Sequence, residues 1–313
     1  MNVYFKKIAI CLPFILFLNG SKGQDDSLVH KSISESAPAL TIYKSLLFNI
    51  DYEANWSYDG KWITFISNRD KGNYNLYVCN NEGQDIRQLT FGNNSDDMPS
   101  ISPDGKKIAF VSERDGNTEI YLIDFDGTNL KRLTKNTAID IHPNWSPDGK
   151  NIIFNSSINN KDTIKLERMD VLLMGMNGEI LNQFTNEGFN SYASFSLDGK
   201  KILYRQAEDD EHSKLIVMDI DKETVEELTD GSFPDGWPSW SPDGKSIVFA
   251  SKRDRYCHVY TMLIRNKTIK EITVGAARYT NPRISPNGKL LMFTGFPKGF
   301  NGNQIYVLKY END

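Results

Sequence analysis

The chain has 313 residues, of which 39% are hydrophobic and 12% aromatic, and its formal net charge is −5. This composition allows a large apolar core. The acidic balance argues against nucleic acid as a partner, because phosphate contacts need clusters of lysine and arginine.

Residues 1–23 predict a secretory signal peptide. Lys6 and Lys7 supply the positive start, residues 8–18 form a short apolar run, and small residues precede an expected cut before Gln24. Removing this segment, which carries three lysines and no acids, takes the formal charge from −5 to −8. The apolar run is too short to span a bilayer, and no other stretch comes close. We therefore expect a mature chain without a transmembrane segment, either periplasmic or secreted.

Residues 24–37 are polar and unpatterned, which predicts a flexible lead-in, and the apolar residues 40–48 predict a strand. A pentapeptide close to Ser-Pro-Asp-Gly-Lys then occurs six times, at 57–61, 102–106, 146–150, 196–200, 241–245 and 285–289. The glycines of these copies are 45, 44, 50, 45 and 44 residues apart. A fixed period of about 40–50 residues is typical of stacked or circular repeat architectures.

Each pentapeptide predicts a tight turn between two strands, because Pro presets φ, Asp or Asn caps the turn and Gly takes positive φ. We interpret it as scaffold rather than as a site. In the second repeat, strands are expected at residues 99–102, 107–112, 119–124 and 130–134. A pair of the Leu-Thr type ends the fourth strand of five repeats, and its late position in the third repeat predicts an insertion at about 158–169.

The sixth repeat would reach the Leu-Thr landmark only beyond the last residue, Asp313. We therefore expect residues 40–48 to supply the missing fourth strand, because this pairing closes a ring and leaves no open edge. The predicted fold is all-β: a six-bladed β-propeller of four-stranded antiparallel blades over residues 38–313, with the N-terminal strand completing the last blade.

Residues 238–245 (Pro-Ser-Trp-Ser-Pro-Asp-Gly-Lys) and 112–121 (Ser-Glu-Arg-Asp-Gly-Asn-Thr-Glu-Ile-Tyr) resemble the repeat of the TolB-like propeller family. This WD40-like repeat also occurs in tricorn protease and in peptidases of the dipeptidyl peptidase IV type. The resemblance covers nearly the whole mature chain and implies the fold, whereas for function it implies either binding or the gating of an enzyme. TolB proper resembles a propeller preceded by an α/β domain, and the peptidases append a hydrolase domain. We expect a bare propeller, because neither addition nor a Gly-x-Ser-x-Gly elbow is found in the sequence.

One repeat position, three residues before Pro99 or its equivalent, carries Asp51, Asp96, Asp140 and Asp235. In a propeller, the loops that lead into the first strands gather at one face around the central channel. A ring of four carboxylates there could hold Ca²⁺ or a cationic ligand group. The alternative, which we favour, is that each aspartate accepts hydrogen bonds from the backbone amides of its own loop.

Arg69, Arg114 and Arg253 lie in Ser-x-Arg-Asp contexts on the other loops of this face, where they can pair with the aspartates. Tyr192 and Trp237 are expected to be exposed at the same channel mouth. Aromatic faces beside carboxylates suit a sugar, a peptide or a partner protein. These nine residues form the predicted site for a ligand or partner.

The case for an enzyme is weaker. His142, His212 and His258 show no spacing typical of metal ligands. Cys79 and Cys257 lie in different repeats and are expected to be free thiols rather than a disulfide.

We therefore expect a monomeric, non-enzymatic binding scaffold of the periplasm or cell envelope, whose partner is an envelope protein or peptide segment. The alternative is a carbohydrate-active propeller that binds or cleaves an oligosaccharide in the manner of a lyase. A third interpretation is a purely structural component of an envelope complex.

Overall fold

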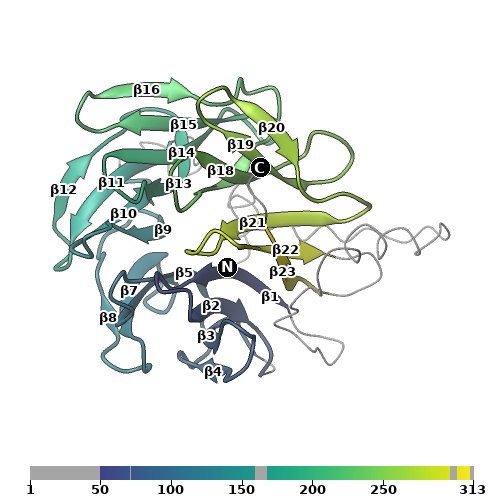
Figure 1. The fold of residues 1–313 in the computed structure, drawn as a ribbon. Helices are drawn as coiled ribbons and strands as arrows, with labels where there is room; N and C mark the ends of the chain where they lie inside the picture. Colours follow the sequence, from purple (N-terminus) through teal and green to yellow (C-terminus); the bar gives the residue numbers. More distant parts are fainter. Residues whose placement is uncertain (1–49, 71, 159–167, 297–301, 311–313) are drawn as a thin grey trace.

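The computed structural model describes residues 50–70, 72–158, 168–296 and 302–310. In these residues, six antiparallel sheets are arranged around a central channel (Figure 1). Five sheets have four strands in sequence order, and the sixth has three, in the order β21-β22-β23. The predicted all-β, six-bladed propeller is confirmed.

The first two blades consist of β1 (Asp51–Trp56), β2 (Trp62–Ser67), β3 (Asn75–Asn80) and β4 (Arg87–Gln88), and of β5 (Asp96–Ile101), β6 (Lys107–Ser112), β7 (Glu119–Asp124) and β8 (Lys131–Arg132). The third and fourth blades consist of β9 (Asp140–Trp145), β10 (Asn151–Ser156), β11 (Asp170–Gly175) and β12 (Ile180–Gln183), and of β13 (Phe189–Phe195), β14 (Lys201–Ala207), β15 (Ser213–Asp219) and β16 (Thr224–Glu227). The fifth blade consists of β17 (Gly236–Trp240), β18 (Ser246–Ser251), β19 (His258–Leu263) and β20 (Thr268–Glu271), and the sixth of β21 (Arg278–Ile284), β22 (Leu290–Phe296) and β23 (Gln304–Lys309). The described residues contain no helix long and apolar enough to cross a membrane.

In the second blade, β6 and β7 have the predicted bounds. Strand β5 begins at Asp96, three residues earlier than predicted, and β8 is limited to two residues. The insertion predicted at 158–169 lies largely outside the described residues. Cys79 and Cys257 are both free, as predicted.

The turns owe their shape to a repeated set of hydrogen bonds. In the second copy, Ser102 Oγ donates to Asp104 Oδ1 (2.7 Å) and accepts from the Lys107 amide (2.9 Å). Gly105 takes a φ of 71°, which is costly for residues with a Cβ. The serine-to-Asp/Asn hydrogen bond recurs in the other five copies, so the pentapeptide is a self-capped turn.

Two further repeat positions build the core. The threonine of the Leu-Thr landmark accepts a hydrogen bond from the third strand, as Thr134 Oγ1 does from the Ile120 amide (2.9 Å). Five residues after each turn glycine stands an aromatic residue of the second strand that is at most 4% exposed: Phe65, Phe110, Phe154, Tyr204, Phe249 and Phe293. Burying such a ring in every blade contributes to the apolar driving force for the fold.

The first and last blades pack directly against each other. Trp56 Nε1 donates to the carbonyl oxygen of Arg283 (3.4 Å), and the Asp51 amide donates to that of Asn303 (3.2 Å). Met292 and Ile305 of the last blade belong to the same apolar cluster as Trp56. Among the described residues, apolar packing and these two hydrogen bonds join the first and last blades. The predicted closing strand at 40–48, the lead-in at 24–37 and the signal peptide at 1–23 lie outside the described residues.

Candidate binding site in the central channel

The first strands of the blades, β1, β5, β9, β13, β17 and β21, contact one another in turn around the centre of the ring. We call the side on which they begin the entry face. The side on which they end, at the Ser-Pro-Asp-Gly turns, is the turn face. The four predicted aspartates lie on the entry face, where each starts or directly precedes a first strand.

Three of these aspartates are buried partners of the predicted arginines. The guanidinium groups of Arg69, Arg114 and Arg253 lie 3.1, 2.7 and 3.2 Å from the carboxylates of Asp51, Asp96 and Asp235. The aspartate side chains are at most 1% exposed. Burial raises the pKa of Asp51 and Asp235, and the neighbouring arginine opposes that shift. These pairs hold loops together within their own blades.

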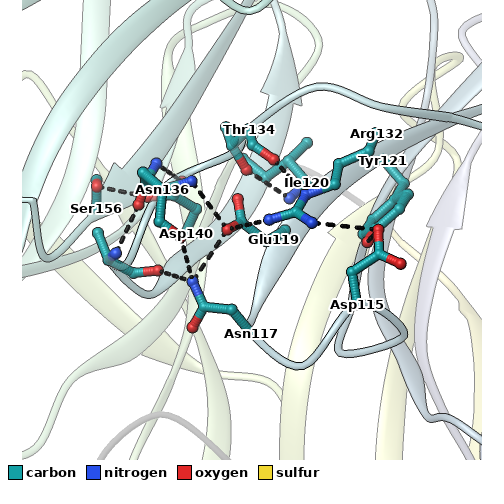
Figure 2. A network of polar contacts seen from close by, with 11 residues as sticks. Asp115, Asn117, Glu119, Ile120, Tyr121, Arg132, Thr134, Asn136, Asp140 and Ser156 are labelled. Atoms are coloured by element: carbon teal, nitrogen blue, oxygen red, sulfur yellow. Dashed lines mark hydrogen bonds and ion pairs between the residues drawn. The ribbon is translucent and has the colours of Figure 1, made fainter.

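Asp140 has no arginine of this kind and is held by a polar network instead (Figure 2). Ser156 Oγ and Asn136 Nδ2 donate to its carboxylate. The backbone N–H of Asn136 donates to Glu119 Oε1 (3.2 Å), and Arg132 Nη2 lies 2.8 Å from the same oxygen. The network joins the second and third blades at the entry face.

The aspartates do not meet as a metal ring. Among the described residues, which include all four, no group of three or more His, Cys, Asp or Glu side chains could hold a metal ion. The Ca²⁺ ring, which was the less favoured alternative, therefore finds no support in this geometry, because each carboxylate turns into its own blade. The partners of these carboxylates are arginine, serine and asparagine side chains.

The predicted exposure of Tyr192 is also wrong, since it is 6% exposed, while Trp237 is partly buried. The Tyr192 ring packs between His142 and Trp237, with centroid distances of 4.0 and 5.6 Å. The cause is backbone geometry: Tyr192 has a φ of 57° and sits at a β-bulge in β13. A bulge changes the direction in which a side chain points.

This bulge recurs in all six first strands. Each shows a register shift against its second strand. The bulge residues are Glu53, Met98, His142, Tyr192, Trp237 and Asn281, all with φ between 50° and 57°. Such a conformation costs about 1 kcal/mol or more for a residue other than glycine. We call these six residues the bulge ring.

Two residues further along each first strand lies a second ring. Its members are Asn55, Ser100, Asn144, Ser194, Ser239 and Arg283, and we call them the polar ring. All six line a cavity of about 320 Å³, together with every bulge-ring residue except Trp237. The cavity continues to the turn face, where Tyr58, Pro147, Leu197, Pro242 and Pro286 line it. Its polar depth and apolar mouth are typical of a ligand site.

Charge in the cavity is concentrated at one side. Burial raises the pKa of Glu53 to about 7, although Arg283 opposes the shift, and the Glu53 carboxyl is hydrogen bonded to that of Asp97. Burial also raises the pKa of Asp97, and the neighbouring Glu53 charge adds to the rise. The two carboxyls therefore hold at least one proton near neutral pH. Burial lowers the pKa of Arg283 to about 10, so this side chain stays charged.

The three histidines of the described residues lie in separate environments. Burial lowers the pKa of His142 to about 3, and the charges of Arg283 and Arg205 add to the effect, so its ring is neutral in the cavity. His258 Nε2 contacts the carbonyl oxygen of Gly275 (2.9 Å), and its Nδ1 contacts Glu271. His212 is exposed beside Asp209. Only His142 belongs to the channel site.

Sequence reasoning did not single out Glu53, Asp97 or Arg283. The repeat alignment contains the signal, because the polar-ring position carries Asn or Ser in five blades and Arg in the sixth. At the bulge-ring position, likewise, the first blade carries Glu53, whereas the other five blades carry uncharged residues.

These features define a β-propeller whose central channel forms a binding cavity. Two family models match the chain: the "TolB beta propeller domain" at residues 178–312 and the "Tricorn protease N-terminal beta propeller domain" at residues 75–212.

Solved structures give the same result. TolB from Acinetobacter baumannii is 27% identical, with a TM-score of 0.64 over 74% of this chain and 56% of the other. A putative TolB from Agrobacterium tumefaciens is 21% identical, with a TM-score of 0.63 over 72% and 80% of the two chains. An oligogalacturonate lyase from Vibrio parahaemolyticus shares the fold at 14% identity, with a TM-score of 0.58 over 87% and 93%. The chain is therefore a TolB-like β-propeller, and its match spans just over half the length of the Acinetobacter protein.

Proposed function

We propose that this protein is an exported, non-enzymatic binding scaffold that takes up a peptide segment of a cell-envelope partner in its central channel. The observation that carries the proposal is the cavity of about 320 Å³, which is lined by one residue of the polar ring from each blade. All six blades contribute to one concave site, which is where binding sites of this architecture are expected.

The cavity mouth supports a peptide as the ligand. Tyr58 and Leu197, which are 40% and 59% exposed, stand where other blades have proline. With Pro147, Pro242 and Pro286 they give the mouth an apolar rim. Apolar side chains of an extended segment can pack on this rim while its backbone meets the polar ring below. The entry face has fewer free charged groups for a ligand, because Asp51, Asp96 and Asp235 are already paired with arginines of their own blades.

The experiment is affinity capture from an envelope extract with two variants that carry the same substitution. One variant is changed inside the cavity and the other at the entry face. Ser239→Trp fills the cavity, and Ser232→Trp adds the same ring to an exposed loop of the entry face. The proposal expects a partner that is retained by the wild type and by Ser232→Trp but not by Ser239→Trp. Loss of the partner only with Ser232→Trp would place the interface on the entry face instead. Retention of no specific partner by the wild type would contradict the proposal.

An oligosaccharide is the second candidate ligand. Tyr192 and Trp240 place aromatic surface in the cavity beside the polar ring, an arrangement that suits sugar binding. The oligogalacturonate lyase from Vibrio parahaemolyticus has the same fold. A glycan-binding screen with the wild type and Ser239→Trp separates the two candidates, and a glycan bound only by the wild type would favour this second one.

A further inference from the structure

The polar ring differs in one blade from the other five. Six equivalent backbone positions face one cavity, and five of them carry Asn or Ser while the sixth carries Arg283. Small polar residues satisfy this position elsewhere: Asn55 Nδ2 and Asn144 Nδ2 donate to backbone oxygens of the next blade, at 3.2 and 3.1 Å. The propeller scaffold therefore does not require an arginine here.

Arg283 also differs from the three arginines in the loops that follow second strands. Arg69, Arg114 and Arg253 each contact an aspartate within 3.2 Å. Within the described residues, Arg283 forms no ion pair, and its one hydrogen bond runs from Nη1 to the carbonyl oxygen of Pro282 (2.9 Å). A guanidinium has five N–H donors, so most of its capacity is directed elsewhere than to the protein. Its side chain lines the cavity.

The charge around Arg283 favours an anion. The acidic groups beside Arg283 are Glu53 and Asp97, which together hold at least one proton near neutral pH and so leave at most one negative charge. His142 is neutral, and Arg205, which is only 6% exposed, adds a second positive charge nearby. A positive charge is therefore left over in the cavity, and a bound carboxylate compensates it through two parallel hydrogen bonds to a guanidinium.

The cavity is lined from the bulge ring to the turn face, and none of the entry-face aspartates Asp51, Asp96, Asp140 and Asp235 lines it. Met98, His142, Tyr192 and Asn281 of the bulge ring are each at most 7% exposed, so these side chains are closely packed at the inner end of the cavity. This arrangement favours the end of a chain, entering from the turn face, over a chain that passes through.

We infer that Arg283 makes this cavity a receptor for a C-terminal carboxylate, so that the inserted peptide segment is the carboxyl end of the partner chain. This inference rests on the proposed function. It specifies which part of the partner enters, and it names Arg283 as the residue that selects it.

The test uses two pools of random octapeptides, one with free C-terminal carboxylates and one amidated, each passed over immobilised protein. The wild type is expected to retain the free acids at least tenfold better than the amides. Arg283→Ser, which copies Ser239 of the preceding blade, should abolish this preference while leaving the thermal melt of the protein cooperative. Adding Ser239→Arg to that variant returns one guanidinium to the ring and should restore part of the preference, which a merely structural role of Arg283 would not.

The pH dependence gives an independent readout. A bound carboxylate makes it harder for Glu53 to lose its proton, so binding takes up a proton and should weaken as pH rises through about 7. Glu53→Gln should remove that decline. The charged or titratable groups facing this site from the surrounding strands are Asp97, His142, Tyr192, Arg205 and Arg283.

The outcomes separate the two proposals. Equal retention of both pools by the wild type, or an unchanged preference in Arg283→Ser, would overturn the carboxylate inference but leave peptide binding intact. Retention of neither pool, or displacement of both by a galacturonate oligomer alone, would overturn the inference together with the proposed function.

Discussion

Replacing Glu53 by glutamine is expected to stabilise the protein at alkaline pH and to have no effect at acid pH. The folded protein raises the pKa of Glu53 from 4.5 to about 7, chiefly through burial. It therefore binds this proton more tightly than the unfolded chain does. Stability should be highest below about pH 4.5 for this group and should fall as pH rises through about 7.

The size of the effect follows from the shift. A rise from 4.5 to about 7, at about 1.4 kcal/mol per unit, gives a loss of about 3 kcal/mol for the fully ionised group. Water in the cavity and the proton shared with Asp97 reduce this value, so we take it as an upper bound. Glutamine keeps the shape without the charge, and Glu53→Gln should raise the melting temperature at pH 8 by about 5 °C, at about 2 °C per kcal/mol for a domain of this size.

The assay is thermal unfolding of both proteins from pH 4 to pH 8.5, with Glu82→Gln, at an exposed turn outside the channel, as the matched control. The control should follow the wild type at every pH. The reasoning fails if Glu53→Gln is no more stable than the wild type at pH 8, or if its advantage is the same at pH 4 as at pH 8.

Three further outcomes are expected. Arg114→Ala should cost about 3 kcal/mol in chemical denaturation because it leaves Asp96 buried and unpaired, whereas Lys106→Ala, which removes an exposed partner of Asp104, should cost less than about 1 kcal/mol. Deleting residues 24–48 should lower the melting temperature because it opens an edge of the last blade, and a change below about 2 °C would rule out the closing strand. Millimolar Ca²⁺ and chelator should both leave the melting temperature unchanged, whereas a rise with the logarithm of free Ca²⁺ would restore the metal site.

Most of the fold could be predicted because its information is local and repeated. The turn pentapeptide is held by hydrogen bonds within six residues, as between Ser102, Asp104 and Lys107, so its sequence alone specifies it. The pairing of Arg114 with Asp96 could also be anticipated, since both flank the same loop region of one blade.

The channel site could not be predicted in the same way, because its geometry depends on a bulge. Regular alternation assigns side chains to faces, and one extra residue in a strand reverses the assignment beyond it. No local signal marks Tyr192 or Met98 as residues with positive φ, since neither is glycine, asparagine or aspartate. Tyr192 was therefore expected at the surface and is found in the channel. The pairing of Glu53 with Asp97 joins two blades, which no pattern within one repeat can show.

The charged residues that depart from the six-fold repeat of the channel lie in neighbouring blades. The scaffold positions, such as the turn serines and the buried aromatics of the second strands, are nearly uniform around it, because every blade has the same packing problem. The charged substitutions in the channel instead fall on Arg283 of the last blade, Glu53 of the first and Asp97 of the second. These three blades are consecutive around the closed ring, and the junction between last and first is held by side-chain packing in the described residues. A carboxylate that contacts Arg283 with the Glu53–Asp97 pair beside it would bridge this junction, so ligand binding and packing of the first blade against the last are expected to stabilise each other.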